Sequence, residues 1–370
     1  MALKSLLLAA LALMLGADAM AGQDSGKKKS RDPARLKEMP SDEDLAKRRA
    51  ESEALPLFKS HDPLAFTLIA NFRALSRDRD TLSTKRFAAR LVVAGTTDTI
   101  PMRLRTRGHY RLAKCSFVPL RMEFTKKTVD GSPFENEKSL KLGTHCQKDD
   151  LYEQYVLREY LVYRIQQLVS PIAFRVRLAR VTYVDSASMN SQGTYWGLIV
   201  ESEEHMAARF GGIVRELRRA TFDDVEQVPL LGMSLFEYMI GNTDWSLYAL
   251  HNVRVISTPS GEILPVPYDF DFSGLVDARY ATPDPKLPIR NVRQRLFRGP
   301  CKAVEEWAPV VARFVGKKAE VMALYDSLPG LDKGYAQDAK EYLADFYRTI
   351  ERPGDMRAEI VENCNRKGGT

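Results

Sequence analysis

The sequence lacks the features that define several protein classes. It holds only 4 Cys among 370 residues, and its 22 Gly and 19 Pro form no repeat or low-complexity tract. Lys and Arg number 55 against 48 Asp and Glu, and the net charge of +7 is spread along the chain. After the N-terminal segment, no apolar run approaches the roughly 18 residues that suggest a membrane span. These absences exclude a collagen-like fibre, a disordered polymer and a multi-span membrane protein. We expect no nucleic-acid partner.

What is present is the composition of a globular chain, preceded by a targeting signal. Hydrophobic residues make up 44% and charged residues 28% of the sequence, and the length suits one large domain or two coupled lobes. The N-terminal segment holds Lys4, an apolar run over 6–15 and an A-x-A pattern within the sequence ADAMA at 17–21. This pattern predicts a signal peptide over 1–21 rather than a buried N-terminal helix. We therefore expect a periplasmic or extracellular protein without a membrane span, and a monomer.

Export changes the meaning of the four cysteines, since disulfides persist in oxidising compartments. Four cysteines allow three pairings. We predict the pairing of sequence neighbours, Cys115 with Cys146 and Cys301 with Cys364. Their spacings match no CxxC zinc pattern, which argues against a metal cluster.

The chain divides into four segments. After the signal peptide, residues 22–54 are charged and carry no apolar face, which indicates a solvated tether or a frayed helix rather than a basic docking arm. Residues 55–202 form a sheet-rich part with one long helix over 151–169, and residues 203–370 are mostly helical. Helices are also expected over 229–240 and through 305–363. Strands are expected over 87–94, 100–105, 117–124, 139–142, 174–184, 194–200, 251–256 and 262–266. Strands first and helices later predict an α+β protein of two lobes.

The long helix carries an unusual carboxylate. Tyr152, Val156, Glu159 and Tyr163 share one stripe of it, and a carboxylate on an aromatic stripe is costly to bury unless it meets a cation. One interpretation pairs Glu159 with Lys141 of the preceding strand. The other pairs Glu159 with a neighbouring arginine, and the pattern favours neither.

Two later segments carry oxygen ligands. GNTDWSLYALHN presents Asp244 in a polar turn and Asn252 eight residues on, and LPVPYDFDFSG ends in Asp269 and Asp271. Hard cations such as Mg²⁺ take carboxylate and amide oxygens, and phosphoryl transfer chiefly requires positioning and charge neutralisation. We therefore expect Asp244 to orient a hydroxyl while Asn252 and Asp269 hold a metal. We expect only one of Asp269 and Asp271 to point into a given site.

Arginines mark a further strand. Arg103, Arg105 and Arg107 alternate along 100–107 and so share one face of it. They form either a phosphate cradle or a solvated surface.

The order of these parts is that of a protein-kinase-like enzyme: lysine strand, glutamate helix, strand ending in Glu201, Asp loop, Asn and a strand ending in Asp. The chain has no HRD and no GxGxxG motif, which excludes an ordinary kinase. Segments 102–111, 139–169 and 194–203, and above all the two motifs quoted, resemble the CotH kinase family, the atypical kinases named after spore coat protein H. The resemblance covers roughly 55–298.

The resemblance implies a two-lobed protein-kinase-like fold that uses ATP with Mg²⁺ or Mn²⁺ and phosphorylates Ser or Thr of a protein substrate. By position, Asp244 is the catalytic carboxylate, and Asn252 and Asp269, with Asp271 beside them, form the metal side. Lys141, Glu159 and Glu201 belong to the nucleotide side. Family members carry a lysine-rich strand after an Arg-Gly element, whereas Arg107-Gly108 leads here to CSFVPL. Lys141 is therefore chosen by spacing, with Lys138 as the alternative.

Two other functions fit the same sequence. A pseudokinase of this fold would be a non-catalytic binding or assembly protein of the cell envelope. A metal-dependent phosphoesterase would use Asp244, Asp269 and His251 and would not need the lysine–glutamate pair.

Overall fold

The computed structural model describes residues 38–365, so the predicted signal peptide and residues 22–37 of the predicted tether lie outside the described part. The helices are α1 (Asp42–Glu53), α2 (Phe72–Arg77), α3 (Tyr110–Lys114), α4 (Lys126–Val129), α5 (Asp150–Val169), α6 (Glu203–Arg209), α7 (Gln227–Ile240), α8 (Val304–Gly316), α9 (Lys318–Ala323), α10 (Lys333–Glu351) and α11 (Pro353–Met356). Shorter helical turns are η1 (Pro56–Phe58), η2 (Phe222–Asp224) and η3 (Arg357–Glu362). The strands are β1 (Leu64–Ala70), β2 (Phe87–Val93), β3 (Thr99–Thr106), β4 (Leu120–Glu123), β5 (Ser139–Gly143), β6 (Val176–Asp185), β7 (Ser191–Val200), β8 (Ile213–Arg215), β9 (Val253–Ser257) and β10 (Ile263–Pro267).

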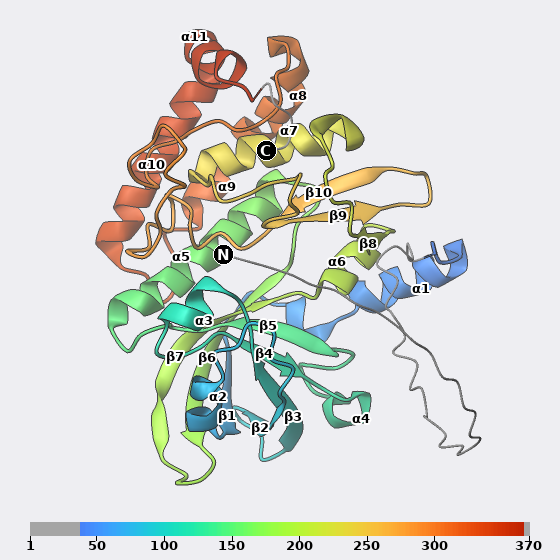
Figure 1. The fold of residues 1–370 in the computed structure, drawn as a ribbon, viewed down its shortest axis with the longest axis vertical. Coiled ribbons are helices and arrows are strands. Elements are labelled where there is room, and N and C mark those ends of the chain that lie inside the picture. Colours follow the sequence, from blue (N-terminus) through green and yellow to red (C-terminus); the bar gives the residue numbers. More distant parts are fainter. Residues whose placement is uncertain (1–37, 366–370) are drawn as a thin grey trace, which may run out of the picture. The chain divides into compact units, whose positions relative to one another are not determined.

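Seven strands close into a barrel in the order β1-β2-β3-β4-β5-β7-β6 (Figure 1). Neighbouring strands in the barrel are antiparallel, except that β1 and β6, which close it, run parallel to each other. The strands alternate as expected for one buried face. Along β3, for example, Ile100, Met102 and Leu104 are buried while Arg103 between them is exposed. The inward leucines and aromatics form the core of this part.

Helix α5 connects the barrel to the rest of the protein. Asp149 caps its first turn by accepting a hydrogen bond from Leu151 N. The helix packs against β6 and β7 and also contacts α7 and α9. Its apolar residues belong to the same core as the helices at the C-terminal end of the chain (Figure 1). A small sheet, β10-β9-β8, completes this half. The prediction of an α+β protein with its helices mostly in the C-terminal half is thus confirmed.

The structure adds elements that the pattern did not indicate. Strands β1 and β8 and helix α3 were not expected. Part of the predicted tether is helix α1, which begins after the capping side chain of Ser41 and contacts α6. Leu45 is buried there, and the Ser52 carbonyl accepts a hydrogen bond from Arg175 Nη2 at 2.6 Å. Residues Asp42–Glu53 thus form a helix that is mostly exposed but is packed at Leu45 and Ser52.

Both predicted disulfides, Cys115–Cys146 and Cys301–Cys364, are present. Such bonds are typical of oxidising compartments outside the cytoplasm, which agrees with the predicted export. Within residues 38–365, none of the helices has the length and apolar character needed to cross a bilayer.

Candidate functional site

The loop that presents Asp244 is shaped by the end of α7. Gly241 ends the helix in the left-handed conformation, with φ 67°. Asn242 then donates from Nδ2 to Glu237 Oε2 at 2.9 Å and accepts from the Asp244 N–H at 3.0 Å. Burial raises the pKa of Glu237 to about 8, the hydrogen bond from Asn242 opposing it. The hydrogen bonds of Asn242 thus connect the loop of Asp244 to the buried carboxyl of Glu237, which favours its neutral form.

Asp244 lies against two of its sequence-predicted neighbours. Asn252 Nδ2 donates to Asp244 Oδ2 at 3.1 Å and to the Asp244 carbonyl at 2.8 Å. His251 Nε2 is 2.9 Å from Asp244 Oδ1, and both side chains are substantially exposed, 55% for His251 and 40% for Asp244. The hydrogen bond from Asp244 raises the pKa of His251 above its usual value, and the charge of Asp269 adds to this. Asp244 and Asn252 are thus brought together.

Asp269 and Asp271 follow β10 in a turn rather than in a continued strand. Asp269 has φ 66°, and its N–H donates to the Tyr163 hydroxyl at 2.9 Å. Asp271 is buried and accepts a hydrogen bond from the Tyr280 hydroxyl at 3.0 Å. Burial raises the pKa of Asp271 to about 6, and the nearby charges of Asp269 and Asp244 contribute to the rise. Asp271 therefore lies close enough to Asp269 and Asp244 for both of their charges to act on it.

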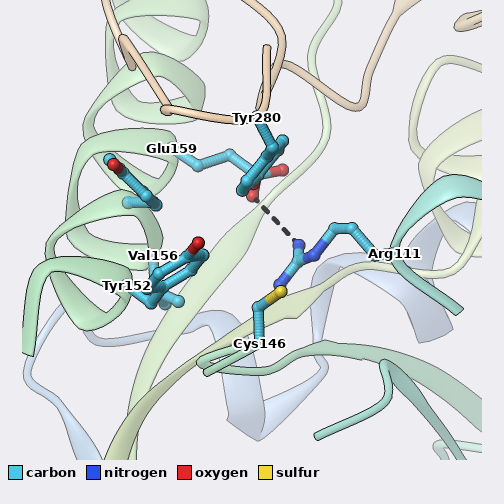
Figure 2. A pocket seen from close by; sticks show the side chains of 7 residues that line it. Arg111, Cys146, Tyr152, Val156, Glu159 and Tyr280 are labelled. Atoms are coloured by element: carbon cyan, nitrogen blue, oxygen red, sulfur yellow. Dashed lines mark ion pairs between the residues drawn. The ribbon is translucent and has the colours of Figure 1, made fainter. Parts of the chain in front are cut away.

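The partner of Glu159 is Arg111 of α3, and the Lys141–Glu159 pair is not formed. Arg111 Nη1 lies 3.9 Å from Glu159 Oε2, and Figure 2 shows this ion pair next to Tyr280. The hollow that these side chains share with Tyr152 has almost no room for a water molecule. Burial raises the pKa of Glu159 to about 8, Asp271 also raises it, and Arg111 opposes the rise. Sequence reasoning left a neighbouring arginine open, but nothing in the sequence singled out Arg111.

Lys141 forms its ion pair with Glu203 instead of Glu159. Its Nζ lies 2.8 Å from Glu203 Oε1 at the start of α6, and the other oxygen of Glu203 pairs with Arg254 at 2.8 Å. Both cations lie over the Tyr268 ring. Burial and then Arg107 lower the pKa of Lys141, while Glu203 and Asp269 oppose this shift. Lys141 is thus within electrostatic reach of Asp269, whereas the alternative, Lys138, is exposed.

Glu201 is engaged elsewhere. Its carboxylate is fully buried and pairs with Arg175 and Arg209, each at 2.8 Å. The Glu201 N–H donates to the Arg175 carbonyl at 3.0 Å. The side chain predicted for the nucleotide side is therefore part of a buried ion cluster.

A cavity of about 280 Å³ opens beside Asp244. His251, Phe272, Asp284 and Arg298 line it together with Asp244. Arg298 Nη1 donates to the carbonyls of Thr243 and Trp245, which fixes one wall of the cavity. Asp244 thus faces a space large enough for a side chain of a substrate.

The donor set suits a hard cation only in part. Asp269, Asp271 and Asn252 supply oxygen atoms, as Mg²⁺ and Mn²⁺ require. In the described part of the chain, no group of three or more His, Cys, Asp or Glu side chains has the arrangement to hold a metal. A cation here would therefore depend on Asn252 and on oxygens from a bound phosphate.

Comparison with known proteins gives no family. No protein-family model matches the chain, and no curated protein matches it. The resemblance to the CotH kinase family therefore rests on the motifs alone.

Proposed function

We propose that this protein is an exported phosphotransferase of the CotH kinase type, with a two-lobed protein-kinase-like fold, that transfers phosphate from ATP to Ser or Thr hydroxyls of a protein. One observation carries the proposal: the position of Asp269. Its charge acts on Lys141 of the barrel and also on His251 and Asp271 of the other half. The ring of Tyr268, the residue before Asp269, lies 4.7 Å from Lys141 Nζ. This proximity supports a site in which a cation contacts phosphate and a carboxylate holds metal, the charge arrangement that phosphoryl transfer uses.

The roles follow from the contacts. Asp244 faces the cavity and would accept or orient the proton of the acceptor hydroxyl. Asn252 and Asp269 would hold the divalent cation, which when bound would neutralise phosphate charge. Lys141 would contact the phosphates, and Arg111 would hold Glu159 and Asp271 in place behind Asp269.

Two observations favour other functions. Lys141 is paired with Glu203 instead of Glu159, which favours a pseudokinase that binds a ligand in the cell envelope without catalysis. The hydrogen bond between His251 and Asp244 favours a metal-dependent phosphoesterase.

The test uses the purified mature protein with labelled ATP, Mg²⁺ or Mn²⁺ and mixed Ser/Thr peptides. We expect transfer of label, and a loss of about 10²-fold or more in Asp244→Asn, since general-base contributions are of this size. Asp269→Ala should lose metal-dependent transfer, whereas Asp223→Ala, at an exposed carboxylate of η2, should keep it.

Each alternative predicts a different result. Label transfer that persists in Asp269→Ala would contradict the metal assignment. Absence of nucleotide binding would favour the envelope-binding protein. Release of inorganic phosphate that survives Lys141→Ala would favour the phosphoesterase.

A further inference from the structure

Three cations form a continuous row across the barrel. Arg105 of β3 lies directly opposite Arg121 of β4, and Arg121 lies directly opposite Lys141 of β5. The residues that alternate with them, such as Leu104, Leu120 and Leu142, are buried in the barrel. The row therefore lies on the outer face of three neighbouring strands, which are side by side in Figure 1.

The row is not neutralised by its surroundings. Glu123 is shared by Arg86 at 2.7 Å and Arg105 at 3.6 Å. Glu203 is shared by Lys141 and Arg254. For Arg121 in the middle, residues 38–365 offer no carboxylate within salt-bridge distance, and its Nη1 donates to the Ser139 hydroxyl at 3.0 Å. Positive charge thus exceeds negative charge along the row.

Such an arrangement is costly for the protein alone. Like charges directly opposite each other on neighbouring strands are destabilising. Burial lowers the pKa of Arg121, the charges of Arg107 and Arg105 lower it further, and Glu203 and Glu123 oppose this only in part. An anion lying along the row would relieve it, since charge-assisted hydrogen bonds from arginine to phosphate are strong.

We propose that Arg105, Arg121 and Lys141 bind a linear oligophosphate, either the phosphate chain of a nucleoside triphosphate or free polyphosphate. Strands lie about 4.8 Å apart, so the row extends about 10 Å, longer than one phosphate group. Its Lys141 end is within the electrostatic reach of Asp269. The inference deepens the proposed function by identifying the donor's phosphate chain as what the barrel binds, and for the nucleotide source it rests on that function.

The experiment measures binding of tripolyphosphate, ATP and AMP to the full chain by calorimetry at low salt. Arg121→Gln should weaken the binding of tripolyphosphate about tenfold or more, because one charge-assisted hydrogen bond is lost. The control is Arg90→Gln, which removes the same charge from the exposed face of β2, opposite Pro101. It should bind as the unchanged protein does, and AMP should bind weakly to all.

Thermal unfolding provides a second readout that does not depend on activity. Without an anion, Arg121→Gln should be as stable as the unchanged protein or more stable, because a like charge has been removed from the row. Tripolyphosphate should raise the melting temperature of the unchanged protein and of Arg90→Gln, and raise that of Arg121→Gln much less.

The outcomes separate the two proposals. If ATP and tripolyphosphate both weaken in Arg121→Gln, the nucleotide is the source. If only tripolyphosphate binds, free polyphosphate is the source and the ATP-dependent function is wrong. If ATP binds equally well to Arg121→Gln and Arg90→Gln, the inference is wrong while the proposed function stands. If neither anion binds, both are wrong.

Discussion

At the scale of single residues, Arg111 determines how the buried carboxylates are held. It faces Glu159 and lies in the field of Tyr280, Asp271 and Asp269. One guanidinium cannot fully compensate several buried acids, so the pKa values of Glu159 and Asp271 stay raised. The sequence predicted the acids, since each stands out from an apolar pattern. It could not predict Arg111, which lies on a five-residue helix far from Glu159 along the chain.

Glu159 should make the stability of the protein depend on pH. Its pKa is raised to about 8 by burial and by Asp271. Between the ordinary carboxyl pKa and about 8, Glu159 is protonated in the folded protein but ionised in the unfolded chain. The stability that it contributes is therefore fully present below the ordinary carboxyl pKa and is lost as the pH rises through about 8. Between pH 5 and 8 we expect the free energy of unfolding to fall, by at most about 1.4 kcal/mol per pH unit for one proton. Urea unfolding at several pH values measures this fall.

Glu159→Gln should make this fall less steep, since the amide stays neutral throughout. The raised pKa values of Glu237 and Asp271 should keep part of the fall. Glu204→Gln, at an exposed position of α6, should keep it. Equal slopes in the two variants would show that Glu159 is ionised in the folded protein.

At the scale of elements, the end of α7 positions the loop of Asp244. Gly241 has φ 67°, and a Cβ atom on it would fall on the Tyr342 hydroxyl. Gly232 in the same helix has no heavy atom within 4 Å of such a Cβ. The two glycines thus differ in backbone conformation and in the space around them.

Opposite effects are expected when each glycine becomes alanine. Gly241→Ala should lower the free energy of unfolding by more than about 1 kcal/mol, because the left-handed conformation disfavours a side chain. Gly232→Ala should raise it by up to about 1 kcal/mol, the difference in helix propensity. Chemical denaturation compares the two, and a stable Gly241→Ala would contradict the role of this turn.

Elements with strong periodicity could be predicted from the sequence. Strands β2, β3 and β5 lie within a residue or two of the expected ranges because each buries a regular face. Helix α5 does so because the capping Asp149 and Ser170 bound its long run of mostly buried residues. Strand β1 was not predicted, because its sequence LAFTLIA is apolar at nearly every position and lacks the apolar–polar alternation that marks a strand. Asp269 and Asp271 were identified, but their turn was not, because a left-handed aspartate leaves no sequence pattern.

At the scale of the whole molecule, each half contains its own disulfide. Cys115–Cys146 links the end of α3 to the loop before α5, near Arg111. Cys301–Cys364 links the segment before α8 to the end of the described chain. The bonds close segments of 31 and 63 residues. Loop-closure entropy is therefore larger for the second.

Replacing each pair of cysteines by serine should cost roughly 3–4 kcal/mol of unfolding free energy. The loss should be about 0.6 kcal/mol greater for Cys301 and Cys364, whose segment is twice as long. Urea unfolding of the two double variants measures both losses. A larger loss from Cys115 and Cys146 would show that local ordering around Arg111 outweighs chain entropy.

The parallel pairing of β1 with β6 has a consequence for how the chain matures. In this pairing, Leu64 lies opposite Ala179 and Ala70 lies opposite Asp185. The barrel therefore cannot close until β6 has been made. Contacts so distant along the chain form slowly. During synthesis, one edge of β1 therefore stays unpaired until β6 has been made, and this exposed apolar edge is open to wrong pairing for that time.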